Sequence, residues 1–291
     1  MNAKINILLL VFLSISISSC KQKDMSSDTN ILFLHHSTGE VIWNGKQASL
    51  IVKAANKISP GIADAISSEA TLVSLVKKHN TEYGKDYLID DLIFPKESPY
   101  GWKNYPYDYY NIWVKNGGDK PYLEEPTLEI LTKEYQVIIF KHCFPVSNIQ
   151  PDMDKEDINS EKKTLANYKL QYLALREKLH EFPENKFILF TGAAQVKSNI
   201  DQDKAERART FFEWVVNEWD QEGDNIYLWD LYNIQTDGEL YLKEDYASSS
   251  TDSHPGSEFA SKAVNLLFNR IIDVVENNGS TTTLEGKKEN N

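Results

Sequence analysis

The sequence predicts an α/β protein in which a parallel sheet lies between two layers of helices. Short apolar runs alternate along the chain with segments whose apolar residues recur every three or four positions. The first of these runs, residues 31–34, is continuously apolar, which indicates a strand that is covered on both faces, as parallel strands are. We expect strands at residues 31–34, 87–94, 136–140, 186–191 and 225–229.

The segments between and after these strands have helical spacing. Residues 164–182 give the clearest pattern, because apolar or aromatic residues return every three or four positions across the whole segment. Residues 49–58 also have a helical pattern, which ends at the Ser-Pro-Gly sequence of residues 59–61. We expect helices at residues 49–58, 71–80, 164–182, 205–219 and 257–276.

Residues 98–113 form an aromatic segment that fits neither pattern. Seven of its sixteen residues are Tyr or Trp and prolines interrupt it, so we expect an inserted loop that can include a short helix. Long ordered loops in compact domains are usually functional. The aromatic segment is interpreted either as a lid packed over the sheet edge or as a carbohydrate site, with rings such as those of Trp102 and Tyr109 stacking on sugars.

The N-terminus has the features of an export signal. Lys4 precedes an apolar stretch at residues 5–17, which is too short to span a membrane and is typical of a signal peptide. Residues 17–20, Ile-Ser-Ser-Cys, resemble the lipobox of bacterial lipoproteins, so we expect a signal peptide at residues 1–19 and lipidation of Cys20; an ordinary secretory signal is the alternative. The protein is then exported and held at the cell envelope by its lipid anchor alone.

The remainder is expected to consist of a flexible tether at residues 20–29, one domain at residues 30–276 and a disordered polar tail at residues 277–291. With Cys20 acylated, Cys143 is the only other cysteine and no internal disulfide can form. The formal net charge of −12 repels phosphates and argues against nucleic acid as a partner. The charge suits a neutral or weakly charged ligand, such as a small molecule or a glycan.

Ser37 is the candidate nucleophile. It lies in the sequence His-His-Ser-Thr-Gly directly after the first strand, and reacting groups in open α/β sheets collect at the carboxyl ends of strands. His254, in a polar loop before the last helix, is the candidate general base, and Asp252 can orient its ring. The alternative is that Ser37 caps a helix and that Asp252 caps a turn.

Together, these residues resemble the SGNH (GDSL-like) hydrolase superfamily. The resemblance implies a three-layer, flavodoxin-like α/β/α sandwich that hydrolyses esters, with oxyanion donors for which His142 and Asn148, after the third strand, are the candidates. The motifs differ from those of the family in three places. His-His-Ser-Thr-Gly replaces Gly-Asp-Ser, the acid lies two residues before His254 where the family has three, and Gly-x-Asn-Asp is absent after the third strand.

Other functions are compatible with the same residues. A metal-dependent hydrolase would use His35, His36, His142 and Asp252, but adjacent strand residues point to opposite faces and no His-x-His or His-Glu-x-x-His spacing is present, so neither a metal nor another cofactor is expected. Cys143 is a further candidate nucleophile, although a lone cysteine after an apolar strand is typically just buried. A non-catalytic glycan-binding or scaffold lipoprotein would have the same fold without the catalytic groups.

Overall fold

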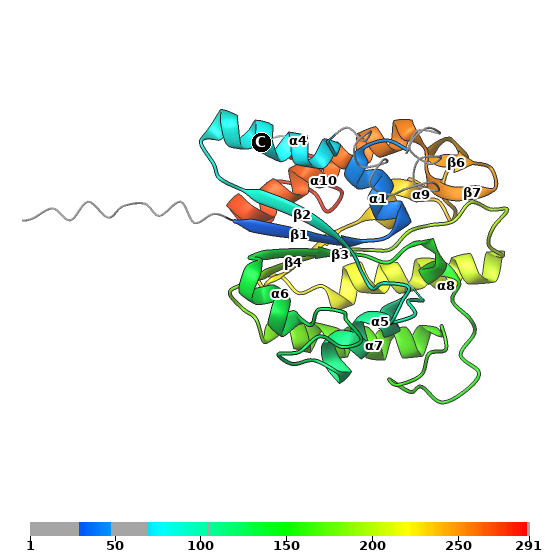
Figure 1. Cartoon of the computed structure of the whole chain (residues 1–291). Coiled ribbons are helices and arrows are strands. Elements are labelled where there is room, and N and C mark those ends of the chain that lie inside the picture. Colours follow the sequence, from blue (N-terminus) through cyan, green and yellow to red (C-terminus); the bar gives the residue numbers. More distant parts are fainter. Residues whose placement is uncertain (1–28, 48–68, 104, 290–291) are drawn as a thin grey trace, which may run out of the picture.

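The computed structural model describes residues 29–47, 69–103 and 105–289, and a five-stranded parallel sheet forms its centre (Figure 1). The strand order is β2-β1-β3-β4-β5, the doubly wound order of flavodoxin. The predicted α/β class and the five predicted strands are confirmed. The strands are β1 (Asn30–His35), β2 (Leu88–Ile93), β3 (Val137–Phe140), β4 (Lys186–Phe190) and β5 (Ile226–Trp229).

Helices cover both faces of the sheet (Figure 1). One face packs against α1, α4 and α10, and the other packs against α7, α8 and the aromatic segment. The predicted helices after residue 70 are confirmed. They correspond to α4 (Thr71–Tyr83), α7 (Leu165–His180), α8 (Gln202–Trp214) and α10 (Ser257–Asn277). A further principal helix, α1 (Ser37–Asn44), was not predicted.

Shorter elements connect the layers in the described chain. β6 and β7 form a separate antiparallel hairpin, and β7 packs against α1. The shorter elements are α5 (Pro106–Tyr109), a π-helix (Tyr110–Lys115), α6 (Leu128–Glu134), a 3-10 turn (Phe144–Ser147), a second π-helix (Val215–Trp219), α9 (Leu231–Thr236), a second 3-10 turn (Glu244–Tyr246), β6 (Ala247–Ser249) and β7 (Asp252–Pro255).

The central strand β1 is continuously apolar from Ile31 to Leu34 because each side of the sheet has its own core. Along β1, Leu32 and Leu34 point toward α7 and the aromatic segment, whereas Ile31 and Phe33 point toward α1 and α10. All four side chains are at most 2% exposed. Burial of an aliphatic or aromatic side chain of this size stabilises the fold by about 1.5–3 kcal/mol, so the central strand is fixed from both sides.

The aromatic segment is part of the core. Tyr105, Tyr109, Ile112 and Trp113 are at most 1% exposed. The three aromatic rings among them pack against rings of neighbouring elements, such as Phe140 and Tyr168. Pro106 occupies the first turn of α5, where the missing amide hydrogen costs no helical hydrogen bond. The first interpretation of this segment, packing over the sheet, therefore describes most of its aromatic side chains.

The C-terminal tail is ordered through residue 289, so the prediction of disorder is wrong for residues 278–289. Asp273 on α10 accepts hydrogen bonds from the backbone and hydroxyl groups of Thr281 and Thr282. The Trp229 indole, at the end of β5, donates to the Glu285 carbonyl. The polar composition of the tail suggested disorder, but its polar groups are satisfied by buried partners on α10 and β5.

Several predictions concern residues outside the described ranges. The signal peptide at residues 1–19, the lipidation site Cys20, the tether up to residue 28 and the helix at residues 49–58 all belong to this group. Within the described ranges, none of the helices is both long and apolar enough to cross a membrane.

Candidate active site

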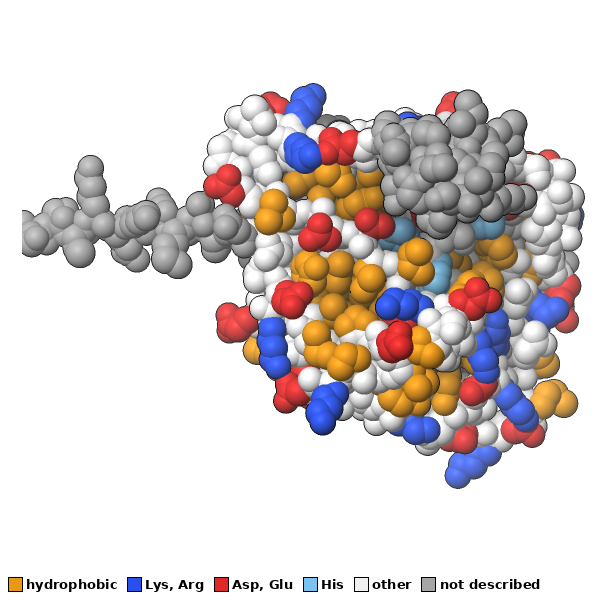
Figure 2. Space-filling model, viewed as in Figure 1, with side chains coloured by type: hydrophobic (Ala, Val, Ile, Leu, Met, Phe, Trp, Pro, Cys, Tyr) orange, Lys and Arg blue, Asp and Glu red, His pale blue; other side chains and the backbone are white. Residues whose placement is uncertain are grey.

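Ser37 lies where the central strand β1 ends and α1 begins. His36 has an extended backbone and caps α1, which makes Ser37 the first helical residue. The site is at the carboxyl ends of β1 and β3, where the winding of the sheet changes direction and where ligands bind in doubly wound folds. In Figure 2, histidine side chains are visible at the surface in this region.

Gly39 allows α1 to start directly after the strand. A Cβ atom at this position would lie 2.4 Å from His35 Cβ and 2.9 Å from Lys141 Cδ, both closer than real side chains approach. The close contact brings the first turn of α1 against the residues that follow β3. The glycine of the His-His-Ser-Thr-Gly sequence therefore has a packing role that positions Ser37.

His254 and Asp252 form a hydrogen-bonded pair on β7. Asp252 Oδ1 lies 2.6 Å from His254 Nδ1 and also accepts a hydrogen bond from the His254 backbone amide at 3.0 Å. Partial burial opposes ionisation of Asp252, but these hydrogen bonds outweigh it and lower the pKa of the carboxyl group. The spacing of two residues thus permits the pairing in which an acid orients an imidazole and leaves its Nε2 atom for chemistry.

Ser37 and His254 line the same surface hollow, which has a volume of about 290 Å³. Asp252, Glu40 and Asn44 line it as well. The Phe144 ring packs edge-on against the His254 imidazole, with 5.0 Å between ring centroids. No hydrogen bond joins the Ser37 hydroxyl to His254 in this conformation; both belong to the described chain, and Ser37 Oγ instead lies 3.4 Å from Cys143 Sγ.

Lys141 and Cys143 belong to the same site. The sequence patterns pointed only to Cys143 as a candidate functional residue, and Lys141 was missed. Lys141 Nζ donates a hydrogen bond to Cys143 Sγ over 2.8 Å, and both residues are 2% exposed. The signal was present in the sequence, because residues 141 and 143 follow an apolar strand at a spacing of two and such positions share one side of an extended chain. A lysine at the end of a central strand must be buried, and a buried ammonium group needs an anionic partner.

His142 is placed differently from the prediction. Its ring is completely buried between Tyr109 and Tyr172, with centroid distances of 5.1 and 5.9 Å, and it does not line the hollow. Burial lowers the pKa of His142 to about 3, so the ring is neutral. Within the described chain neither ring nitrogen has a hydrogen-bond partner. An oxyanion role for His142 is therefore not compatible with its position in the core.

Tyr109 is likewise a core residue and is not available to stack on a sugar. Its hydroxyl donates to the Lys141 carbonyl at 3.0 Å, and its ring is 1% exposed. Trp102 is partly exposed and stacks on His36, with 4.4 Å between ring centroids. Since His36 adjoins Ser37, only the Trp102 ring of this predicted pair remains beside the site.

Asn148 ends the 3-10 turn after Cys143 and is partly exposed. Its Oδ1 atom accepts a hydrogen bond from Gln195 Nε2 at 3.2 Å, and the residue does not line the hollow that contains Ser37. The predicted oxyanion residue Asn148 is thus bonded to Gln195, away from the hollow. The backbone amide of Ser37, the first residue of α1, remains a candidate oxyanion donor.

The four residues considered as alternative metal ligands, His35, His36, His142 and Asp252, do not converge. His35 Nε2 lies 3.0 Å from Asp91, and His36 Nε2 bonds to the Pro95 carbonyl. The other two, His142 and Asp252, lie respectively in the core and beside His254. The described residues contain no group of three His, Cys, Asp or Glu side chains arranged to hold an ion.

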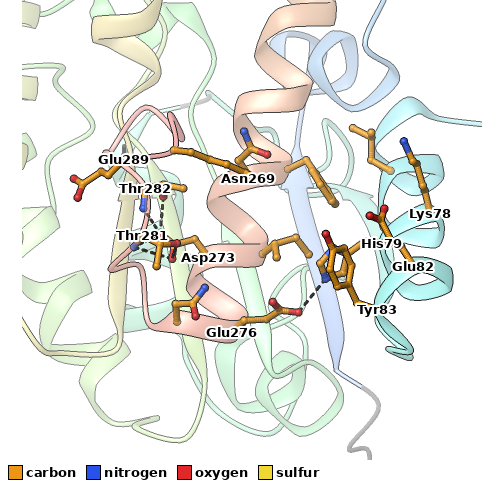
Figure 3. Close-up of a pocket in the computed structure, with 15 residues that line it drawn as sticks. Lys78, His79, Glu82, Tyr83, Asn269, Asp273, Glu276, Thr281, Thr282 and Glu289 are labelled. Atoms are coloured by element: carbon orange, nitrogen blue, oxygen red, sulfur yellow. Dashed lines mark hydrogen bonds and ion pairs between the residues drawn. The ribbon is translucent and has the colours of Figure 1, made fainter. Parts of the chain in front are cut away.

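A larger hollow, of about 490 Å³, lies between α4 and α10 (Figure 3). His79 on α4 bonds to Glu276 on α10 at 2.9 Å, as the dashed line in Figure 3 marks. The hydroxyl groups of Thr281 and Thr282 in its lining donate to Asp273. No serine or cysteine is among the described residues that line it, so acyl-transfer chemistry is better placed at Ser37.

Comparisons with known proteins leave the function to be argued from the site. No family model matches the chain, and no curated protein matches it. A solved structure described as "BT4096 a gut microbial diltiazem-metabolizing enzyme" is similar at 13% identity and a TM-score of 0.42 over 81% of this chain. This chain spans 45% of the length of that protein, and similarity at this level of identity concerns the fold alone.

Proposed function

We propose that this protein is a serine ester hydrolase of SGNH type that forms an acyl-enzyme on Ser37, with His254 as general base and Asp252 orienting its ring. The observation that carries the proposal is the common hollow. A serine after the first strand and a His–Asp pair near the last helix line one cavity at the carboxyl edge of the sheet. This edge is where α/β folds place their reacting groups.

The geometry assigns a role to each group in ester hydrolysis. The Ser37 hydroxyl attacks the ester carbonyl, and the His254 imidazole receives a proton from an attacking group in the hollow. Asp252, 2.6 Å from Nδ1, stabilises the imidazolium ion that then forms. The backbone amide of Ser37, at the positive end of α1, is the candidate donor to the oxyanion.

The proposed substrate is an acyl group on a carbohydrate. Asn44, Gln47 and Ser248 line the hollow beside Ser37, and their polar groups can form hydrogen bonds with a hydroxyl-rich ligand. Trp102 is partly exposed next to His36 and offers an aromatic face near the site. An exported lipoprotein, as the N-terminal sequence suggests, would meet glycans at the cell envelope.

The alternative is a non-catalytic glycan-binding protein on the same fold. One observation favours it: the Ser37 hydroxyl lies against Cys143 and makes no hydrogen bond to His254, although both residues are described. Catalytic hydrogen bonds are often long or misaligned without substrate, so this geometry is also compatible with an enzyme.

Release of p-nitrophenol from p-nitrophenyl acetate tests the proposal. We expect the Ser37→Ala variant to lose activity. Its melting temperature should be close to that of the wild type, because the Ser37 side chain is small and partly exposed. Ser261→Ala, an exposed serine on α10, is the matched control and should keep full activity. A fluorophosphonate probe should label the wild type at Ser37; absence of labelling together with absence of activity would favour the binding protein.

A further inference from the structure

Three groups that can donate a hydrogen bond surround Cys143 Sγ. Lys141 Nζ lies at 2.8 Å, the Ser37 hydroxyl lies at 3.4 Å, and the Thr38 backbone amide also bonds to the sulfur. A neutral thiol is a weak acceptor and carries a hydrogen of its own, whereas a thiolate accepts several charge-assisted hydrogen bonds. The groups around Cys143 Sγ, at the start of α1, are therefore arranged to stabilise a thiolate.

The charge balance around Lys141 points to the same state. Lys141 is buried, and it forms no ion pair with any Asp or Glu of the described chain. The titratable side chains packed around it are His35, His36, His142 and Tyr109. Burial keeps the two histidines next to it neutral, with the pKa of His36 lowered to about 4 and that of His142 to about 3.

Cys143 is thus the group that can neutralise the buried ammonium. Burial opposes the thiolate, but the Lys141 charge and the hydrogen bonds from Lys141, Ser37 and Thr38 outweigh it and lower the pKa of Cys143 below its ordinary value. Burial lowers the pKa of Lys141, and the negative charge of a thiolate 2.8 Å away counteracts this effect. Neither side chain has a role in the catalytic scheme given above.

We propose that the Cys143 thiolate, held by Lys141, accepts the proton of Ser37 during acylation, and that the His254–Asp252 pair is the base for water in deacylation. This inference rests on the proposed ester hydrolase and assigns its two proton transfers. The Ser37 hydroxyl already lies against the sulfur, whereas His254 faces the hollow, which water and the acyl group would occupy. Cys143 contacts the reacting oxygen, and Lys141 is a positioning residue.

The steps balance. In acylation the Ser37 Oγ–H bond breaks, its proton moves to Cys143 Sγ, Oγ bonds to the ester carbon and the carbonyl electron pair moves to oxygen. When this intermediate collapses, the carbon–oxygen bond to the alcohol breaks, and the leaving alkoxide takes the proton from Cys143. In deacylation water gives its proton to His254 Nε2 and attacks the acyl carbon. On collapse, Ser37 Oγ leaves and recovers the proton from His254.

Mass spectrometry of the full chain during hydrolysis of p-nitrophenyl acetate separates the two bases. We expect His254→Ala to release one equivalent of p-nitrophenol and to accumulate acetyl-Ser37, because acylation does not need the imidazole. Cys143→Ala should acylate on the order of 10²–10⁴-fold more slowly, the usual effect of removing a general base. His180→Ala removes the imidazole of a distant His–Asp pair, 2.8 Å apart, and is the matched control with unchanged kinetics.

Two outcomes would overturn the inference in distinguishable ways. Normal acylation in Cys143→Ala, combined with no acylation in His254→Ala, would assign the serine proton to His254 and leave the proposed function intact. No acylation and no fluorophosphonate labelling of the wild type would remove the proposed function and the inference together.

The role of Lys141 is tested by a readout that does not depend on activity. In a full chain carrying Cys20→Ser, the ultraviolet absorbance of the thiolate reports only on Cys143. We expect Lys141→Met to shift the formation of the thiolate to higher pH and to shift the pH profile of acylation in the same direction. Lys186→Met, which removes a lysine bonded to the end of α10, is the control for loss of a half-buried lysine.

Cys143→Ser covers the case in which Lys141→Met does not fold. It keeps a hydroxyl of similar shape but cannot supply an anion, so acylation should remain as slow as in Cys143→Ala. An unchanged thiolate titration in folded Lys141→Met, or full acylation in Cys143→Ser, would overturn the assignment.

Discussion

The Ser37 hydroxyl oxygen lies 3.4 Å from Cys143 Sγ, although 106 residues separate the two in sequence. The contact follows from the sheet, because β1 and β3 pair in parallel, with Leu34 opposite Phe140. The residues that follow the two strands therefore emerge side by side at one edge. The candidate nucleophile is consequently set against the buried Lys141–Cys143 pair on one side and against the hollow that contains His254 on the other.

Asp252→Asn should lower turnover without unfolding the protein. The amide cannot stabilise an imidazolium ion and can hold the ring of His254 in the wrong tautomer, so we expect a decrease in kcat on the order of 10²-fold or more. Asp252 is partly exposed, and the melting temperature should change little. Asp224→Asn, at the distant His180 pair, is the matched control; an equal effect of both variants on kcat would contradict a catalytic role for Asp252.

Gly39→Ala should impair both stability and activity. The added methyl group would collide with His35 and Lys141 at 2.4 and 2.9 Å, and overpacking of this kind costs about 1–3 kcal/mol. Because the first turn of α1 would have to move, we expect the kcat for ester hydrolysis to fall as well. Gly223→Ala is strained by its positive φ but has open space around it, so it should lose stability and keep its activity in the same assays.

Asp273 should make the stability of the protein depend on acid. Burial opposes its ionisation, but hydrogen bonds from Thr281 and Thr282 outweigh it and lower the pKa of the folded carboxylate. A lowered folded pKa stabilises the fold above the unfolded pKa of about 3.9, and this contribution is lost as the pH falls through the folded value. Asp273→Asn should therefore cost about 1.5–3 kcal/mol at neutral pH.

Thermal melts of wild type and Asp273→Asn across the acid range provide the measurement. The difference in melting temperature should be constant near neutral pH and should shrink below about pH 4. Glu213→Gln, an exposed partner of Arg209 on α8, is the control for the loss of a surface carboxylate. A difference that stays constant into strong acid would mean that the carboxylate of Asp273 is not ionised in the folded protein.

EDTA should leave ester hydrolysis unchanged. Of the four candidate metal ligands, His35, His36 and Asp252 are bonded to Asp91, the Pro95 carbonyl and His254. The fourth, His142, is enclosed in the core. The proposed chemistry uses only side chains and water. Loss of activity that a divalent cation restores would instead support the metal-dependent hydrolase.

Local patterns carried the prediction of the secondary structure. Apolar runs located the five strands of the parallel sheet, and the run in β1 is unbroken because that strand is buried on both faces. β2, at the edge of the sheet, contains Asp90 and Asp91 and is largely exposed. The same patterns could not show that the side chains of Tyr109 and His142 are enclosed in the core, since burial depends on which elements pack together. They also could not show that residues 278–289 pack against the domain, because these residues are held by hydrogen bonds to Asp273 and Arg270 on α10.

The sequence by itself determined the α/β class and marked Ser37, Asp252 and His254, because hydrophobic periodicity and residues at strand ends are local properties of the chain. Only the tertiary structure decided that β1 and β3 are neighbours and that Lys141 and Cys143 lie beneath Ser37. Strand order and side-chain burial arise from contacts between segments distant in sequence. These contacts decide which charged groups are buried away from water and therefore need a partner.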